Sequence, residues 1–302
     1  MTAHHRAMRL QNQAILITGS TTGIGAAMAR RFVAEGAHVI LHGRDVARGE
    51  ALLEELGAEN AAFIAGDLAD EHHPAQLAAA ALECFGKIDA LVNNAALTTR
   101  AHIADTDTAF FDRVVAVNLR APLMLIRALL PGLKKSQGCV LNIGSILAHC
   151  GQSNLVAYSI SKGGLMTLTR NLADTLGPDR VRVNQMNVGW TLTENEYQTK
   201  LGDGLPENWP ETLPAYAAPS GSLLMPEDIA EAALYWVSPA SRPISGTVFE
   251  AEQYPMIGRI PNQENQEEEM AMERVAKEPN GTAHFIPLPH IPLPRKVANR
   301  TP

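Results

Sequence analysis

A tyrosine and a lysine four residues apart could form an acid–base pair in this chain. On a helix, Tyr158 and Lys162 would share one face, one turn apart. A free phenol has a pKa near ~10, and a neighbouring ammonium lowers it toward neutral pH. Ser145, thirteen residues upstream, adds a hydroxyl group. An ordinary helix with a half-buried tyrosine and a solvated lysine would show the same spacing. The surrounding elements must therefore decide whether this is a catalytic pair.

Short apolar runs alternate with helical patterns along most of the sequence. We expect strands at 14–18, 37–41, 61–65, 88–93, 139–143, 181–186 and 247–249. We expect helices at 25–35, 47–56, 74–85, 108–133, 155–176 and 226–236. This alternation predicts an α/β fold, a Rossmann-type doubly wound parallel sheet with helices on both faces.

The expected single domain covers 13–252, with an N-terminal extension at 1–12. Within it, 190–225 is rich in Gly, Pro and aromatic residues and is expected to form a substrate lid. A C-terminal extension, 253–302, ends in a Pro-rich stretch with interleaved Phe, Ile and Leu. We hypothesise that this extension reaches across an oligomer interface.

Composition narrows the class of protein. The chain has 302 residues, 46% hydrophobic and 19% charged, with a net charge of −7, which disfavours a broad nucleic-acid-binding face. Its three cysteines show no metal-type spacing, so we expect no metal site and a reducing, cytoplasmic location. We find no signal sequence and no apolar run approaching ~18 residues, and therefore expect no membrane span.

A glycine-rich turn follows the first expected strand. Its spacing is Gly-x-x-x-Gly-x-Gly, and the next helix begins at its end. Glycines let backbone N–H groups approach a pyrophosphate, and a helix N-terminus favours its charge. A tight turn that needs small residues for packing is the alternative. We predict a dinucleotide contact formed by Gly19, Ser20, Thr22, Gly23, Ile24 and Gly25.

The end of the second strand indicates which nicotinamide cofactor is preferred. An acidic residue there selects a free ribose 2′-hydroxyl, whereas an arginine accommodates a 2′-phosphate. Gly43 occupies the acidic position and Arg44 follows it, which favours NADP(H) over NAD(H). Asp45 could either serve the ribose or cap the next helix.

With this loop, Ser145, Tyr158 and Lys162 in order, the chain resembles the short-chain dehydrogenase/reductase family over about residues 12–250. Further motifs match at strand ends: Asp67, the run 93–96 (Asn-Asn-Ala-Ala), Asn118, and the run 187–193 (Asn-Val-Gly-Trp-Thr-Leu-Thr). Ala96 and Val188 depart from the family pattern, which has Gly and Pro there, and the usual Val-Asp-Gly-Gly ending is absent.

The resemblance implies a ketone–alcohol oxidoreductase. Tyr158 would be the general acid/base, Lys162 would lower its pKa and bind the nicotinamide ribose, Ser145 would hold the substrate oxygen, and Asn118 would help position a water. Further cofactor contacts are implied at Asp67, Leu68, Asn94, Ala95, Gly189, Thr191 and Thr193. Trp190 is expected to join Ser145 and Tyr158 in contacting the substrate.

The substrate is left open by the sequence. A sugar, a polyol or a cyclic ketone would suit the aromatic lid, which carries Trp190, Tyr197, Trp209 and Tyr216, although these residues could equally form the lid's own core. Reduction of a 3-oxoacyl thioester is an alternative, and a catalytically silent nucleotide-binding protein is a rival of another class. Glu194 and Glu196 are expected in solvent. A thiol–imidazole pair of His149 and Cys150 is disfavoured. A homodimer or homotetramer is expected.

Overall fold

The computed structural model describes residues 8–215 and 217–255. The expected C-terminal extension lies almost wholly outside the described residues, as does Tyr216, so the hypothesis that the extension reaches across an oligomer interface is not tested.

Seven parallel strands form one sheet, in the order β3-β2-β1-β4-β5-β6-β7. The strands are β1 Ala14–Ile17, β2 His38–Gly43, β3 Ala61–Ala65, β4 Ala90–Asn93, β5 Cys139–Ser145, β6 Arg182–Val188 and β7 Val248–Ala251. The chain order reverses beside β1, so the carboxyl ends of β1 and β4 flank a crevice of the kind that binds dinucleotides. The predicted doubly wound sheet is confirmed.

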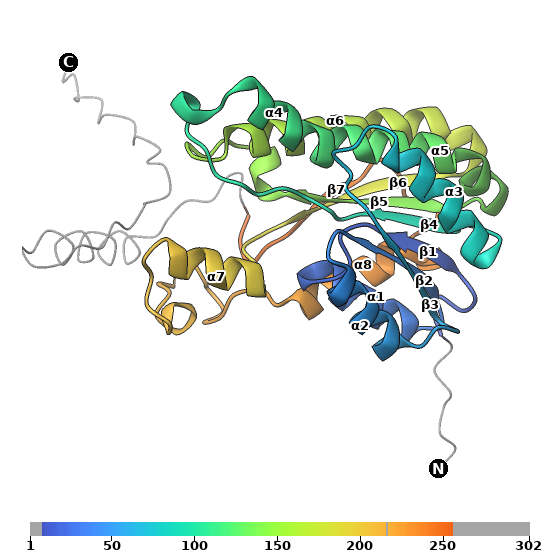
Figure 1. Cartoon of the computed structure of the whole chain (residues 1–302), viewed down its shortest axis with the longest axis horizontal. Helices are drawn as coiled ribbons and strands as arrows, with labels where there is room; N and C mark the ends of the chain where they lie inside the picture. Colours follow the sequence, from blue (N-terminus) through green and yellow to red (C-terminus); the bar gives the residue numbers. More distant parts are fainter. Residues whose placement is uncertain (1–7, 216, 256–302) are drawn as a thin grey trace, which may run out of the picture.

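Helices cover both faces of the sheet (Figure 1). One layer comprises α1 Gly23–Val33, α2 Val46–Leu56 and α8 Pro226–Val237. The other comprises α3 His73–Phe85, α4 Thr108–Val115, α5 Ala121–Ser136 and α6 Val156–Leu176. Alternate strand residues serve the two layers, so Ile15 and Ile17 pack under α1 while Ala14 and Leu16 pack under α5.

The single long helix expected at 108–133 is interrupted. A π-helical turn, Ala116–Arg120, separates α4 from α5 and contains Asn118. Such turns insert an extra residue into a helix and are frequent at functional sites. Residues 108–136 are long and apolar enough to cross a membrane, but half of the most apolar window is buried in the fold, and core helices meet the same criterion.

The expected lid region contains a helix that the sequence patterns did not predict. Helix α7, Glu194–Gly202, stands apart from both helix layers in Figure 1. It carries few apolar residues, and its start is fixed by Thr193, whose hydroxyl accepts a hydrogen bond from the Glu196 N–H at 3.1 Å.

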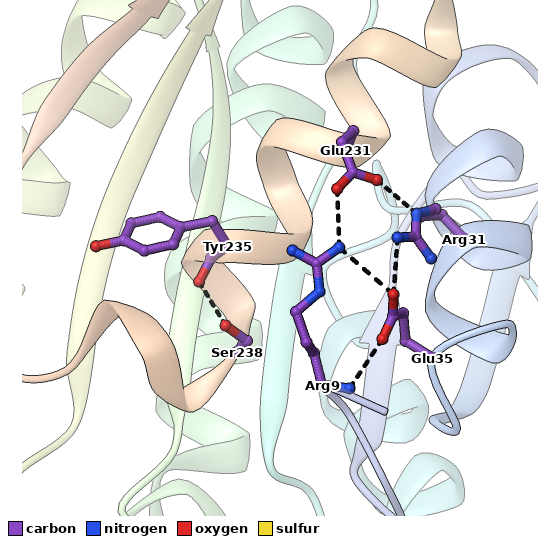
Figure 2. A network of polar contacts seen from close by, with 6 residues as sticks. All are labelled: Arg9, Arg31, Glu35, Glu231, Tyr235 and Ser238. Atoms are coloured by element: carbon purple, nitrogen blue, oxygen red, sulfur yellow. Dashed lines mark hydrogen bonds and ion pairs between the residues drawn. The ribbon is translucent and has the colours of Figure 1, made fainter. Parts of the chain in front are cut away.

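The end of the N-terminal extension packs onto the domain. Leu10 is fully buried in the core, and Arg9 lies between the carboxylates of Glu35 and Glu231 (Figure 2). Arg31 of α1 bonds the same two carboxylates, at 2.7 and 2.6 Å. This four-residue network joins the N-terminal segment, α1 and α8.

Candidate active site

Ser145, Tyr158 and Lys162 meet at the carboxyl end of β5. Ser145 is the last residue of β5, and its hydroxyl group lies close enough to the Tyr158 hydroxyl to act on its pKa. Lys162 lies one turn further along α6, with Nζ 5.6 Å from the centroid of the Tyr158 ring. Its ammonium donates to the Ile143 carbonyl at 2.7 Å, and only 2% of the residue is exposed. The structure therefore brings together the three groups that the spacing suggested.

The electrostatics of this pair differ from the expectation. Burial raises the pKa of Tyr158, the neighbouring Ser145 hydroxyl opposes that rise, and the negative charge of Glu196 adds to it. Burial also lowers the pKa of Lys162 to about 8. We expected the lysine to lower the pKa of Tyr158, but burial is the largest influence on that pKa and Lys162 is not among the groups that shift it. Both groups are thus shifted toward their neutral forms.

Asn118 is a fully bonded amide in the π-helical turn. Its Oδ1 accepts from the Leu97 N–H at 2.8 Å, while its Nδ2 donates to the Leu97 carbonyl and the Ser161 hydroxyl. Ser161 in turn donates to the Tyr158 carbonyl at 2.6 Å. Asn118 therefore ties the segment after β4 to the helix that carries Tyr158, and its expected role in positioning a water stays a prediction.

The glycine-rich turn has the shape that a pyrophosphate needs. Gly19 and Gly23 adopt φ values of +62° and +52°, and a Cβ on Gly19 would lie 2.8 Å from the Ala95 Cα. A Cβ on Gly25 would lie 2.3 Å from the Gly19 carbonyl oxygen. Helix α1 has no acidic residue in its first turn, and the Thr22 side chain makes no capping bond. The N-terminus of α1 thus fits an anion, and Ile24 packs its side chain on the core beneath.

Some predicted cofactor residues shape this turn from within. Asn94 donates from Nδ2 to the carbonyls of Thr18 and Gly19, both at 2.9 Å, and the Ala95 N–H donates to the Thr18 hydroxyl. Ser20 is fully buried: its N–H donates to the His42 carbonyl and its hydroxyl accepts from the His42 N–H. The hydroxyl also donates to the His42 carbonyl at 3.5 Å, so Ser20 joins the turn to β2, and its expected contact with the cofactor stays a prediction.

The ends of β2 and β3 place an arginine beside an aspartate. Arg44 is exposed after β2 and close enough to Asp67 to act on its charge. Burial tends to raise the pKa of Asp67, but the Ala69 N–H, Arg113 and Arg44 together lower it. Leu68 is buried, which leaves its backbone to face a cofactor. Asp45 caps α2 by accepting from the Arg48 N–H, while its contact with the ribose stays an open prediction.

The segment after β6 crosses toward the glycine-rich turn. A Cβ on Gly23 would lie 3.3 Å from the Thr193 methyl carbon, so the two segments are in contact. Gly189 has no room for a side chain, because the Glu252 carboxylate would lie 2.0 Å from its Cβ. That carboxylate accepts from the Trp190 N–H at 3.0 Å, and Thr191 is buried. The predicted residues Gly189, Thr191 and Thr193 therefore lie between the glycine-rich turn and the Ser145–Tyr158 pair.

The lid aromatics form a small core of their own. The Trp190 ring stacks on the Trp209 ring with centroids 5.6 Å apart, and the Tyr197 ring stacks on Trp209 as well, at 6.2 Å. Trp209 is only 1% exposed. Of the two interpretations left open, the structure favours the packing one for Trp190, since the Lys200 ammonium lies over its ring.

Glu196 and His149, both named from the sequence, are polar side chains near the site whose partners only the structure shows. Glu196 is half-buried rather than solvated: it accepts from Trp190 Nε1 at 2.9 Å and acts on the charge of Tyr158. His149 lies between Asn187 and Glu250, at 3.1 and 3.3 Å from its Nε2. Cys150 contacts the Ile146 carbonyl instead, so the two neighbours form no thiol–imidazole pair. Within 8–215 and 217–255, no group of three or more potential metal ligands occurs.

Comparison with known proteins agrees with this geometry. The family model described as short chain dehydrogenase matches residues 13–202. The chain belongs to the short-chain dehydrogenase/reductase family. It is 34% identical to L-fucose dehydrogenase of Mus musculus, over 77% of this chain and 85% of that one. It is also 34% identical to 2-(S)-hydroxypropyl-CoM dehydrogenase 3 of Xanthobacter autotrophicus, over 80% and 95%.

A solved structure adds a likeness in three dimensions. The 3-ketoacyl-(acyl-carrier-protein) reductase from Brucella melitensis, complexed with NADH, superposes with a TM-score of 0.71 at 32% identity, over 80% of this chain and 97% of that one. As a member of the short-chain dehydrogenase/reductase family, this protein is an NAD(P)-dependent oxidoreductase acting on CH–OH groups.

Proposed function

We propose that this protein interconverts a secondary alcohol and a ketone, with Tyr158 as the general acid/base and NADP(H) as the preferred cofactor. The closeness of the Ser145 and Tyr158 hydroxyl groups, with Lys162 one turn further along α6, carries the proposal, because one substrate oxygen can bond to both hydroxyl groups. Ser145 holds that oxygen, and Tyr158 gives it a proton during reduction or takes one during oxidation. The nicotinamide, when bound, supplies or accepts the hydride.

Lys162 is placed to act on Tyr158 and on a ribose. Its ammonium is buried one helical turn from the phenol and is held by a single carbonyl, which leaves two N–H donors. A positive charge there favours the phenolate when a proton leaves Tyr158. Tyr158→Phe tests the assignment: turnover should fall by several orders of magnitude while NADPH still binds, as followed by nucleotide fluorescence. Turnover that survives this change contradicts the mechanism.

The NADP(H) preference is supported by the exposed Arg44 and by Asp45, whose carboxylate caps α2. Gly43 carries no carboxylate that would repel a 2′-phosphate, and the Asp45 carboxylate is engaged with the Arg48 N–H and guanidinium. Arg44→Ala should lower kcat/KM for NADPH about tenfold or more and leave that for NADH nearly unchanged. Arg30→Ala is a matched control, since Arg30 is an exposed arginine of α1 that pairs with Glu55. An unmodified protein that prefers NADH would refute the proposal.

A sugar, a polyol or a cyclic ketone is the proposed substrate class. Glu196 and Glu252 lie beside the site, where they would accept hydrogen bonds from hydroxyl groups and repel anionic substrates. The similarity to L-fucose dehydrogenase supports the same class. The similarity to a 3-ketoacyl-(acyl-carrier-protein) reductase supports the alternative, a 3-oxoacyl thioester. Rates with a panel of sugars, cyclic alcohols and an acetoacetyl thioester would discriminate between them.

Exposed apolar residues and the state of the cysteines support proposals for the assembly and the location of the protein. Ile160 of α6 and Leu123 of α5 are exposed apolar side chains on one helix layer, which supports a homodimer or homotetramer. Cys84, Cys139 and Cys150 are all free thiols, which supports a reducing, cytoplasmic compartment. Light scattering on the purified protein would give the assembly state.

A further inference from the structure

A chain of buried polar side chains runs across the sheet toward the active site. Asn93 donates to Asn142 at 2.8 Å, Asn142 to Thr169 at 2.8 Å, and Thr169 to Gln185 at 3.1 Å. Gln185 donates to Asn187 at 2.7 Å. These five residues, called here the polar chain, are each at most 3% exposed. Buried amides are retained at this density only where their partners are fixed, so the polar chain is a rigid unit.

The polar chain ends on His149. Asn187 Nδ2 lies 3.1 Å from His149 Nε2, and the amide of Asn187 is oriented by the hydrogen bond that its Oδ1 accepts from Gln185. Gly144, the residue before Ser145, leaves room for this arrangement, since a Cβ there would lie 2.2 Å from Asn187 Oδ1. The last link of the polar chain therefore passes directly beside the strand that presents Ser145.

His149 is held at one ring nitrogen only. Asn187 Nδ2 and Glu250 Oε1 both face Nε2, which either accepts from Asn187 or donates to Glu250 according to the tautomer, so that β6 and β7 hold the ring from the same side. Within 8–215 and 217–255, no hydrogen bond to Nδ1 is formed. The ring lies in the turn that follows Ser145, at the carboxyl edge of the sheet, where substrates bind in doubly wound folds. Its side chain is 18% exposed, which makes it reachable from solvent.

We propose that His149 binds a second hydroxyl group of the substrate through Nδ1, so that the preferred substrate is a vicinal diol or a sugar rather than a simple alcohol. The inference rests on the proposed function, because it needs the first oxygen to be held by Ser145 and Tyr158. A ring fixed at Nε2 presents Nδ1 in one orientation, and a hydroxyl group can either donate to it or accept from it. When Nε2 carries the proton and donates to the Glu250 carboxylate, Nδ1 becomes a stronger acceptor.

The test compares a diol with its matched simple alcohol. Oxidation of trans-1,2-cyclohexanediol and of cyclohexanol is followed with NADP⁺ by absorbance of the reduced nicotinamide. The unmodified protein should favour the diol in kcat/KM by about tenfold, the worth of one hydrogen bond to the substrate. His149→Phe should reduce the ratio of the two kcat/KM values to near one, and the change should be a higher KM for the diol. Asn187→Leu should reduce it part of the way, because the ring loses one of its two anchors.

Controls separate binding of a hydroxyl group from a merely structural role. Cys150→Ser changes the neighbouring exposed residue, which contacts only the Ile146 carbonyl, and should keep the diol preference. If His149 had only a structural role, its substitution would lower kcat/KM for both substrates alike. Weaker NADPH binding or a lower unfolding midpoint would accompany that loss. His149→Gln, which keeps a polar group, should retain part of the preference.

The two proposals fail in different ways. If neither alcohol, and no member of the wider panel, is oxidised in a Tyr158-dependent manner, the proposed function is wrong and this inference falls with it. If kcat/KM for cyclohexanol equals that for the diol, or if His149→Phe keeps the diol preference, only the role of His149 is refuted.

Discussion

The lowered pKa of Lys162 predicts an unusual gain in stability at alkaline pH. The ammonium has a pKa of about 8 in the folded chain against its usual 10.5. Between these values the folded chain has lost the proton and the unfolded chain keeps it, so the free energy of unfolding rises with pH. Between pH 7 and pH 9.5 the rise from this one group is about 2 kcal/mol. Tyr158, whose pKa is raised, contributes little below about pH 10 because its phenol stays protonated in both states.

The comparison of the unmodified protein with Lys162→Met isolates this contribution. Urea unfolding, followed by the fluorescence of the three tryptophans, gives the free energy of unfolding at each pH. The gap between the two proteins should shift by about 2 kcal/mol in favour of the unmodified one from pH 7 to pH 9.5. Lys134→Met is the matched control, since Lys134 is a half-exposed lysine paired with Asp179, and its curve should follow the unmodified protein. A gap independent of pH would refute the reasoning.

Other substitutions test the cofactor turn, the ion-pair network and the lid. Gly25→Ala places a Cβ 2.3 Å from the Gly19 carbonyl oxygen, so NADPH binding should be lost in fluorescence titration and the unfolding midpoint should fall. Hydrogen bonds from Arg31 and Arg9 lower the pKa of Glu231 to about 2, so the stability it adds is complete above about pH 4.5 and is lost as the pH falls toward 2. Glu231→Gln should remove that acid dependence, by no more than about 1 kcal/mol, because the carboxylate is half-exposed and screened by salt. Trp209→Ala should empty the core of the lid and raise KM for the alcohol while NADPH binding persists.

The strands and the site could be predicted because their signals are local. An apolar run such as 14–17 becomes a central parallel strand wherever both faces of the sheet are covered. Tyr158 and Lys162 meet Ser145 because a strand end and the first turn of the following helix are brought together by the alternating topology. The glycine-rich turn is likewise set by positive φ values and close backbone approach, which only glycine satisfies.

The rest depended on contacts between distant segments. Helix α7 has little apolar periodicity by which a sequence pattern could predict it. Its position is set instead by Trp190 and Trp209, which stack beside it. The π-helical turn at Asn118 cannot be read from a periodic pattern, because an inserted residue leaves the flanking helices intact. Ser20 was expected to face the cofactor, yet it bonds to His42 on the neighbouring strand, a partner that spacing along the chain does not indicate.

Burial explains why the sign of the Tyr158 shift was also beyond the sequence. The spacing of Tyr158 and Lys162 gives the attraction between a phenolate and an ammonium, but the loss of hydration depends on every element packed around them. In the structure that loss raises the pKa of Tyr158 and lowers the pKa of Lys162 to about 8, so that at pH 7 the phenol is neutral and the lysine still carries its charge. A neutral phenol is the form that donates a proton to a ketone, so the folded chain alone is set for reduction. Oxidation of an alcohol requires Tyr158 to accept a proton, and the positive charge that Lys162 keeps below about pH 8 stabilises the phenolate that accepts it. Because the equilibrium constant ties the two directions together, Lys162→Met should lower turnover both for the alcohol and for the ketone. It should also move the rise of kcat for alcohol oxidation to a higher pH, as a pH profile of kcat would show.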